Sequence, residues 1–176
     1  MQSPRITVIS GTDRVDNNTE KVAAMYLRIL NERNIPAGHL RLRELPRDLD
    51  RWGTYGAPSP FLRGVIEEHL RPVRDLVFIV PEYNGSFPGV LKLFLDLIPP
   101  KVLYGKRSSL VGVSDGQSGN LRGLDQLAAV FHYLRMDVLW FKPRLAAILA
   151  ALDGRNELDH PPTQALIADQ IDLIMA

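Results

Sequence analysis

The chain has 176 residues, of which 45% are hydrophobic, and this size and composition predict one domain, residues 1–176, around one core. Its 21 basic and 20 acidic residues nearly cancel, so the overall charge provides no attraction to nucleic acid or to an anionic membrane surface. The absence of cysteine excludes disulfides, cysteine-ligated clusters and thiol nucleophiles, and it favours a cytoplasmic location.

Five strands are expected from the hydrophobic pattern. The first residues, MQSPRITVIS, predict a strand at residues 6–9 rather than a signal peptide, because they hold no long hydrophobic stretch behind a basic one. Continuous hydrophobic runs at residues 76–80 and 110–113 predict further strands that are covered on both faces. The alternating stretch 39–44 predicts a more exposed strand, and residues 138–141 a fifth.

Helices are expected between these strands. Hydrophobic residues at helical spacing predict helices around residues 22–30, 124–134 and 167–175. Ser59 followed by Pro60 predicts a helix that runs to about Leu70, and Pro88 opens another. Residues 143–162 fit either a short helix or an extended arm, with a turn at Asp153-Gly154, and no hydrophobic run approaches the roughly 20 residues that a membrane span requires.

This alternation of strands and helices predicts an α/β fold with a doubly wound five-stranded parallel sheet, order 2-1-3-4-5, and helices on both faces. In that order a ligand binds at the carboxyl ends of strands one and three. The turns after Ser10 and Val80 are therefore the expected location of a site.

The first of these turns, residues 11–19, reads GTDRVDNNT and leads directly into a helix. Backbone N–H groups at a helix start, with hydroxyl groups and the Arg14 guanidinium, would form a phosphate site. Alternatively, Asn18 or Thr19 only caps the helix and Arg14 is solvated. The turn has neither GxGxxG nor GxxxxGK[ST], so the dinucleotide-fold and nucleoside-triphosphatase alternatives lose their main support.

The second turn carries the most specific pattern. The stretch PEYNGSFPGVLKLFLDLI, from Pro81 onward, closely resembles the signature of the NADPH-dependent FMN reductases, a family of flavodoxin-like flavoproteins in which this loop holds the isoalloxazine ring. The first turn is similar to the family's GSxRxxSxN, with Thr12 for the first serine and Arg14 in place. Asn17 and Thr19 stand where serine and asparagine are usual, and both can still hydrogen-bond an oxygen.

The resemblance extends to a third turn, residues 114–120, which is similar to the family's glycine-rich turn beside the flavin. The usual paired glycine is partly lost here, since Asn120 to Arg122 precede Gly123. The likeness covers the chain from Arg5 to about Phe141.

The resemblance implies a flavodoxin-like enzyme of the NAD(P)H-dependent FMN reductase or quinone reductase type. Its cofactor would be FMN, and electrons would pass from NADPH or NADH through FMN to a small acceptor such as a flavin or quinone. A homodimer or homotetramer, with the site near a subunit boundary, is also implied. One alternative is a flavodoxin-type electron carrier that does not oxidise nicotinamide. Such a carrier would benefit from a strong electric field of a single sign, which a net charge of +1 does not give. The other alternative is a flavodoxin-like domain that has lost its flavin.

The residues expected to bind the cofactor lie in the three turns. They are Gly11, Thr12, Arg14, Asn17, Asn18 and Thr19 on the phosphate side, Pro81, Glu82, Tyr83, Asn84 and Gly85 on the ring side, and Asp115, Gly116 and Ser118 beside the ring.

Within this set, Tyr83 would provide a flat hydrophobic platform, or would simply pack over the next helix. Glu82 is given a structural role, and no catalytic residue is assigned, because hydride transfer to a flavin requires no protein acid or base. No metal site is expected, since the four histidines lack ligand spacing. Trp52 and Tyr55 would cover a ring or, as favoured here, pack against a neighbouring subunit, and the arginines at 41, 43, 47 and 51 predict a solvated face.

Overall fold

The computed structural model describes residues 5–46 and 57–176. The expectations for Trp52, Tyr55, Arg47 and Arg51 lie outside the described residues. Within the described part of the chain, no helix is long and hydrophobic enough to cross a membrane.

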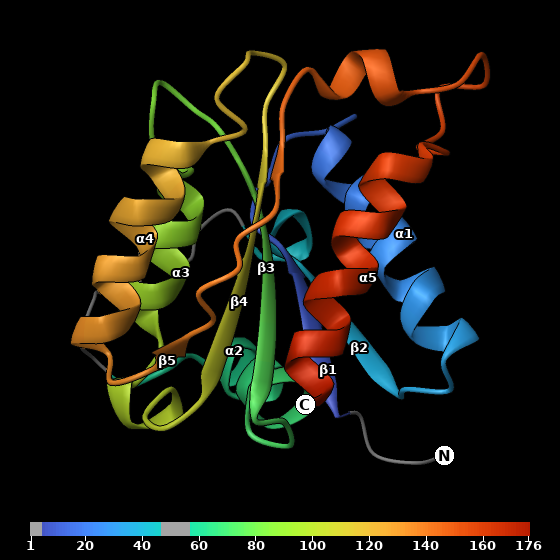
Figure 1. Ribbon diagram of the computed structural model, residues 1–176. Coiled ribbons are helices and arrows are strands. Elements are labelled where there is room, and N and C mark those ends of the chain that lie inside the picture. Colours follow the sequence, from blue (N-terminus) through green and yellow to red (C-terminus); the bar gives the residue numbers. More distant parts are fainter. Residues whose placement is uncertain (1–4, 47–56) are drawn as a thin grey trace.

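A parallel sheet forms the centre of the fold (Figure 1). Its strands are β1 (Ile6–Ser10), β2 (Ala37–Arg41), β3 (Asp75–Pro81), β4 (Arg107–Val113), β5 (Asp137–Val138) and β6 (Arg144–Leu145). The order β2-β1-β3-β4-β5 confirms the predicted order 2-1-3-4-5. The three central strands are buried along almost their whole length, because they are covered on both faces.

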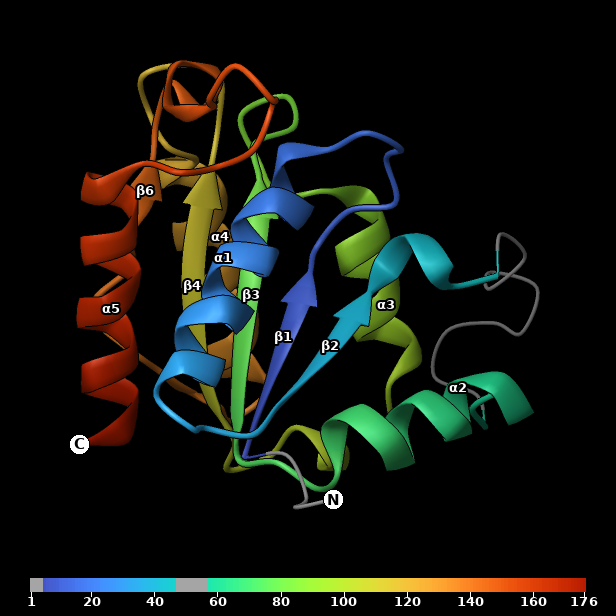
Figure 2. The same cartoon turned by 90° about the vertical axis from the view of Figure 1, so that its right-hand side faces the viewer.

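In the part of the chain that the structure describes, five α-helices cover the two faces of the sheet (Figures 1 and 2). They are α1 (Asn18–Glu32), α2 (Pro60–Val65), α3 (Gly89–Leu97), α4 (Leu121–Tyr133) and α5 (Pro161–Met175), and a π-helical turn, Ile66–Leu70, continues α2. One hydrophobic cluster packs α1 and α5 against the sheet, and a second packs α2, α3 and α4 against the opposite face. Helices on both faces are therefore confirmed.

The predicted strand at residues 39–44 is wrong at both ends. Strand β2 begins at Ala37 and ends at Arg41, and a 3-10 helix, Leu42–Glu44, follows. Arg41 pairs with Ser10, the last residue of β1, so the chain beyond Arg41 has no strand to continue against.

The fifth strand position is occupied by two short pieces rather than one strand. β5 pairs with the beginning of β4 and β6 with its end. Between them the side chain of Gln170 on α5 donates to the carbonyl oxygens of Leu110 and Phe141, both at 3.0 Å. Gln170 thus provides a hydrogen bond at the place where the ladder is interrupted.

The segment after β6 combines the two expected alternatives. A short 3-10 helix, Ile148–Ala151, follows the strand, and an isolated bridge then joins Leu152 to Leu158. The expected turn at Asp153-Gly154 is present: the Asp153 carboxylate accepts from the backbone N–H groups of Arg155 and Glu157, at 2.9 and 2.8 Å. This segment lies over the carboxyl-end edge of the sheet, near the start of α1 (Figure 1).

Candidate functional site

A pocket of about 380 Å³ lies where the carboxyl ends of β1, β3 and β4 meet. The first, second and third loops (residues 11–19, 81–89 and 114–120) all contribute to its wall. The predicted site residues that line it are Arg14, Asn17, Asn18, Thr19, Pro81, Glu82, Tyr83 and Asp115. The remaining ones, Gly11, Thr12, Asn84, Gly85, Gly116 and Ser118, lie in the same loops without lining it.

The first loop ends in a capped helix, and the cap is Asn17. Its side-chain oxygen accepts from the backbone N–H of Glu20 at 2.8 Å, and its amide nitrogen donates to the Arg14 carbonyl at 2.7 Å. Asn18 and Thr19, the caps considered from sequence, are instead the first two residues of α1. Their backbone N–H groups have no acceptor among the described residues, which leaves them available to an anion.

Thr19 places a buried polar atom at the start of α1. Its side chain is 1% exposed, and its hydroxyl has no hydrogen-bond partner within residues 5–46 and 57–176. Buried hydroxyls are usually paired, since an unpaired one costs about 1–3 kcal/mol. Arg14, in the same wall, is exposed and forms no ion pair with any described residue. The helix start, this hydroxyl and this guanidinium together fit a phosphate group.

Two predicted first-loop residues serve the architecture of the loop. Gly11 donates its N–H to the Ile79 carbonyl at 2.9 Å, and a Cβ at this position would lie 2.9 Å from that same oxygen. Thr12 is fully buried, and its hydroxyl lies 2.6 Å from the Tyr83 hydroxyl. The first and second loops are therefore joined by this contact, which fixes the far end of a half-buried tyrosine ring.

The second loop is a two-residue turn. Tyr83 and Ser86 exchange both backbone hydrogen bonds, at 2.9 and 3.0 Å, and Asn84 and Gly85 have φ angles of 52° and 75°. Two successive positive φ angles define a type I′ turn, for which Asn-Gly is the preferred sequence. The N–H groups of Asn84 and Gly85 have no acceptor in the described part of the chain and can bind a polar ligand edge.

Glu82 connects the second loop to the third. Its carboxylate accepts from the Ser118 hydroxyl and from the backbone N–H of Asn120, the latter at 3.2 Å. The structural role expected for Glu82 agrees with these contacts, and Ser118 contributes to the same connection. Asp115, which lines the pocket, and Gly116 are both exposed, and the Gly116 carbonyl accepts from Ala147 N–H at 3.0 Å.

Several residues of this site were not predicted. Ile148, Leu149 and Asn156 come from the segment after β6 and line the pocket together with Lys21, whose ammonium donates to the Asn156 side chain at 2.7 Å. Nothing in their local sequence places that segment beside α1. For Asn120 the sequence did hold an indication. An asparagine stands where the resembled pattern has a glycine, and asparagine is a residue that tolerates a positive φ.

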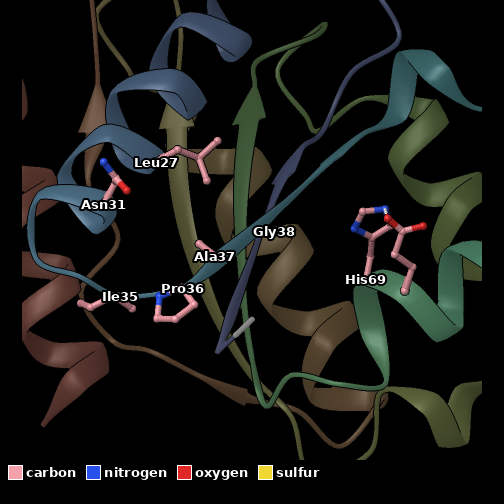
Figure 3. A pocket seen from close by; sticks show the side chains of 8 residues that line it. Leu27, Asn31, Ile35, Pro36, Ala37, Gly38 and His69 are labelled. Atoms are coloured by element: carbon pink, nitrogen blue, oxygen red, sulfur yellow. Dashed lines mark ion pairs between the residues drawn. The ribbon is translucent and has the colours of Figure 1, made fainter. Parts of the chain in front are cut away.

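A second hollow, of about 530 Å³, lies around the edge strand β2. Figure 3 shows Leu27 and Asn31 of α1 on one side of the strand and His69 on the other. His69 faces the Glu68 carboxylate at 3.6 Å. This hollow lies beside the amino-terminal part of β2, not at the carboxyl ends of the strands, so it is not the predicted site.

His39 lies on the same strand with Nε2 2.9 Å from the Ser10 hydroxyl, while its Nδ1 is buried without a partner among the described residues. Burial, and then the charges of Arg41, His69 and Arg43, lower the pKa of His39 to about 4, so the ring is neutral at pH 7. Arg41 and Arg43 are paired with acids rather than only solvated, and the described residues contain no cluster that could hold a metal ion.

The chain is similar in sequence to known proteins. The model of the family described as NADPH-dependent FMN reductase matches residues 4–140. An NAD(P)H-dependent FMN reductase from Pseudomonas aeruginosa is 30% identical over 112 residues, which cover 61% of this chain and 60% of that protein. A 2-hydroxy-1,4-benzoquinone reductase from Burkholderia sp. is 30% identical over 95 residues, which cover 52% of this chain and 51% of that protein.

The chain thus spans about half to three fifths of the length of these relatives. Among solved structures, a flavoenzyme NAD(P)H:(acceptor) oxidoreductase from Paracoccus denitrificans superposes with a TM-score of 0.77 at 18% identity, over 98% of this chain and 97% of the other. A flavodoxin from Megasphaera elsdenii superposes with a TM-score of 0.59 at 13% identity, over 93% of this chain and 96% of the other. Together with the strand order, these similarities confirm the flavodoxin-like fold.

Proposed function

Because the chain belongs to the NADPH-dependent FMN reductase family, we propose that it is an enzyme that binds FMN and passes electrons from NADPH or NADH to a small acceptor. A flavin or a quinone is the proposed acceptor class, which the names of the two curated relatives support. Residues 1–176 would form a single FMN-binding domain, located in the cytoplasm. The two hydrophobic clusters on the faces of one sheet support the single domain.

One observation carries the cofactor assignment: the buried hydroxyl of Thr19, a residue that lines the pocket at the start of α1, has no hydrogen-bond partner among residues 5–46 and 57–176. The N–H groups of Asn18 and Thr19 and the exposed Arg14 guanidinium complete a site for the FMN phosphate. The amide of Asn17 already caps the helix, so its contribution is to hold the loop in shape.

The ring of the cofactor would lie against the second and third loops. Tyr83 presents a half-buried aromatic surface, and the turn Asn84-Gly85 offers backbone N–H groups to a polar edge. When bound, FMN supplies a ring that accepts hydride from a reduced nicotinamide and passes the electrons on. The protein contributes position and exclusion of water. We assign no acid or base, because Glu82 is engaged with Ser118 and Asn120.

A homodimer or homotetramer is also part of the proposal. Tyr133 and Trp140 are 87% and 74% exposed, and large exposed aromatic side chains are common at interfaces between subunits. Light scattering of the purified protein measures the assembly directly, and a monomer at micromolar concentration would contradict this part of the proposal.

The function is tested by titrating the purified chain with FMN and with riboflavin, and then by following NADPH and NADH consumption with added quinone or excess FMN. We expect FMN to bind more tightly than riboflavin and the nicotinamide to be consumed continuously. Tight FMN binding without nicotinamide oxidation would instead indicate an electron carrier. Absence of flavin binding would show a domain that has lost its cofactor.

A further inference from the structure

Asn120 adopts a left-handed conformation with φ of 63° at the start of α4, and its side chain is fully buried. Asparagine is among the few non-glycine residues that tolerate this conformation. Its amide nitrogen donates to the carbonyl oxygens of Val80 and Pro81, both at 3.0 Å. The residue that replaces a glycine of the resembled pattern therefore ties the third loop to the end of β3.

Glu82 makes the same connection in the opposite direction. From the second loop, its carboxylate reaches the Ser118 hydroxyl and the Asn120 backbone N–H of the third loop, while its own N–H donates to the Val113 carbonyl at 2.9 Å. We refer to Glu82, Ser118 and Asn120 as the clasp. The two loops are thus joined by side chains that extend from each one to the other.

Close packing holds the clasp in one arrangement. A Cβ on Gly123 would lie 2.2 Å from Oδ1 of Asn120, 2.7 Å from the carbonyl carbon of Ser86 and 2.8 Å from the amide nitrogen of Phe87. The backbone of α4 therefore lies directly against both the Asn120 side chain and the second loop. Rotation of the Asn120 side chain away from Val80 and Pro81 is blocked on that side.

We propose that the clasp is the positioning element for the ring end of the cofactor site, an inference that rests on the proposed function. A flat, rigid ring is held productively only if the groups around it are fixed to within about 0.5 Å. The second loop provides Tyr83 and the Asn84-Gly85 turn, and the third loop provides the adjacent wall. By fixing the distance between these loops, the clasp controls ring binding through the positions of Tyr83 and the Asn84-Gly85 turn.

The substitution Asn120→Gly tests this, because glycine keeps the positive φ without strain and removes only the amide. We expect FMN and riboflavin, which share the ring, both to bind about tenfold more weakly, a loss on the scale of two hydrogen bonds. At saturating FMN, kcat with NADPH falls as well, because the ring is misplaced.

Asn34→Gly is the matched control. Asn34 also has a positive φ, 57°, and is exposed after the end of α1, away from the pocket. This variant should bind both flavins as the parent does. Thermal unfolding of each apoprotein separates lost folding from lost positioning.

Failure of the parent protein to bind any flavin would overturn the proposed function itself. If the parent binds flavin and Asn120→Gly binds FMN and riboflavin with unchanged affinity, the clasp has no positioning role. A loss restricted to FMN, or one explained by the unfolded fraction alone, would also overturn the inference.

Discussion

The substitution Thr19→Val should weaken FMN binding and, at the same time, make the apoprotein more stable. Valine has nearly the shape of threonine but replaces the hydroxyl with a methyl group. In the apoprotein that hydroxyl is buried without a partner in the described structure, so its removal should raise the free energy of unfolding by about 1 kcal/mol. A hydrogen bond to a charged phosphate contributes about 1.5–3 kcal/mol, so the FMN dissociation constant should rise roughly 10- to 150-fold.

Chemical denaturation measures the first quantity, and fluorescence titration of the apoprotein measures the second. Riboflavin, which lacks the phosphate, should bind Thr19→Val almost as it binds the parent. Thr163 provides the control, because it is also buried in the first turn of a helix, but its hydroxyl lies 2.9 Å from Nδ1 of His160. Thr163→Val should therefore lower stability and leave FMN binding unchanged.

A Thr19→Val variant with a less stable apoprotein and an unchanged FMN affinity would contradict this placement of the phosphate. The Thr19 hydroxyl would then serve the fold, and the phosphate site would have to be placed elsewhere.

Three further results are expected. Arg14→Ala should raise the FMN dissociation constant by about one to two powers of ten and leave the riboflavin dissociation constant unchanged. In parallel titrations the control Arg28→Ala, which removes one partner of an exposed ion pair, should change neither dissociation constant. Tyr83→Phe removes the contact with Thr12 and should weaken FMN and riboflavin equally, by up to about tenfold, so a loss for FMN alone would contradict the ring-side placement. His39 has a lowered pKa, so between about pH 6.5 and 4 the unfolded ring takes up a proton and the folded ring does not. Stability should fall as the pH drops through this range, by about 1–2 kcal/mol for this partly exposed ring, and urea unfolding of His39→Phe should lack that contribution.

The strand order and the location of the site were predictable because they depend on short-range patterns. A continuous hydrophobic run within a strand reflects burial on both of its faces. The alternation of strands and helices then fixes which edge of the sheet binds the ligand. The turn at Asn84-Gly85 was predictable for the same reason, since positive φ angles select these residue types locally.

The finer geometry depends on contacts between residues far apart in the chain. Thr12 meets Tyr83 across 71 positions, and Gln170 reaches Leu110 across 60, so no local pattern signals that the ladder beside β4 is interrupted. The end of β2 at Arg41 depends on where its partner strand ends. The helix cap shows the same limit, because Asn17, Asn18 and Thr19 are all competent caps and only backbone conformation selects Asn17.

The visible spectrum of the FMN-loaded protein, recorded without oxygen before and after one equivalent of NADPH or NADH, tests the central claim most directly. We expect the bands of oxidised flavin to disappear on addition of the nicotinamide and to return when a quinone is added. A spectrum that stays oxidised with both nicotinamides, in protein shown to hold FMN, would contradict the assignment as a nicotinamide-dependent reductase.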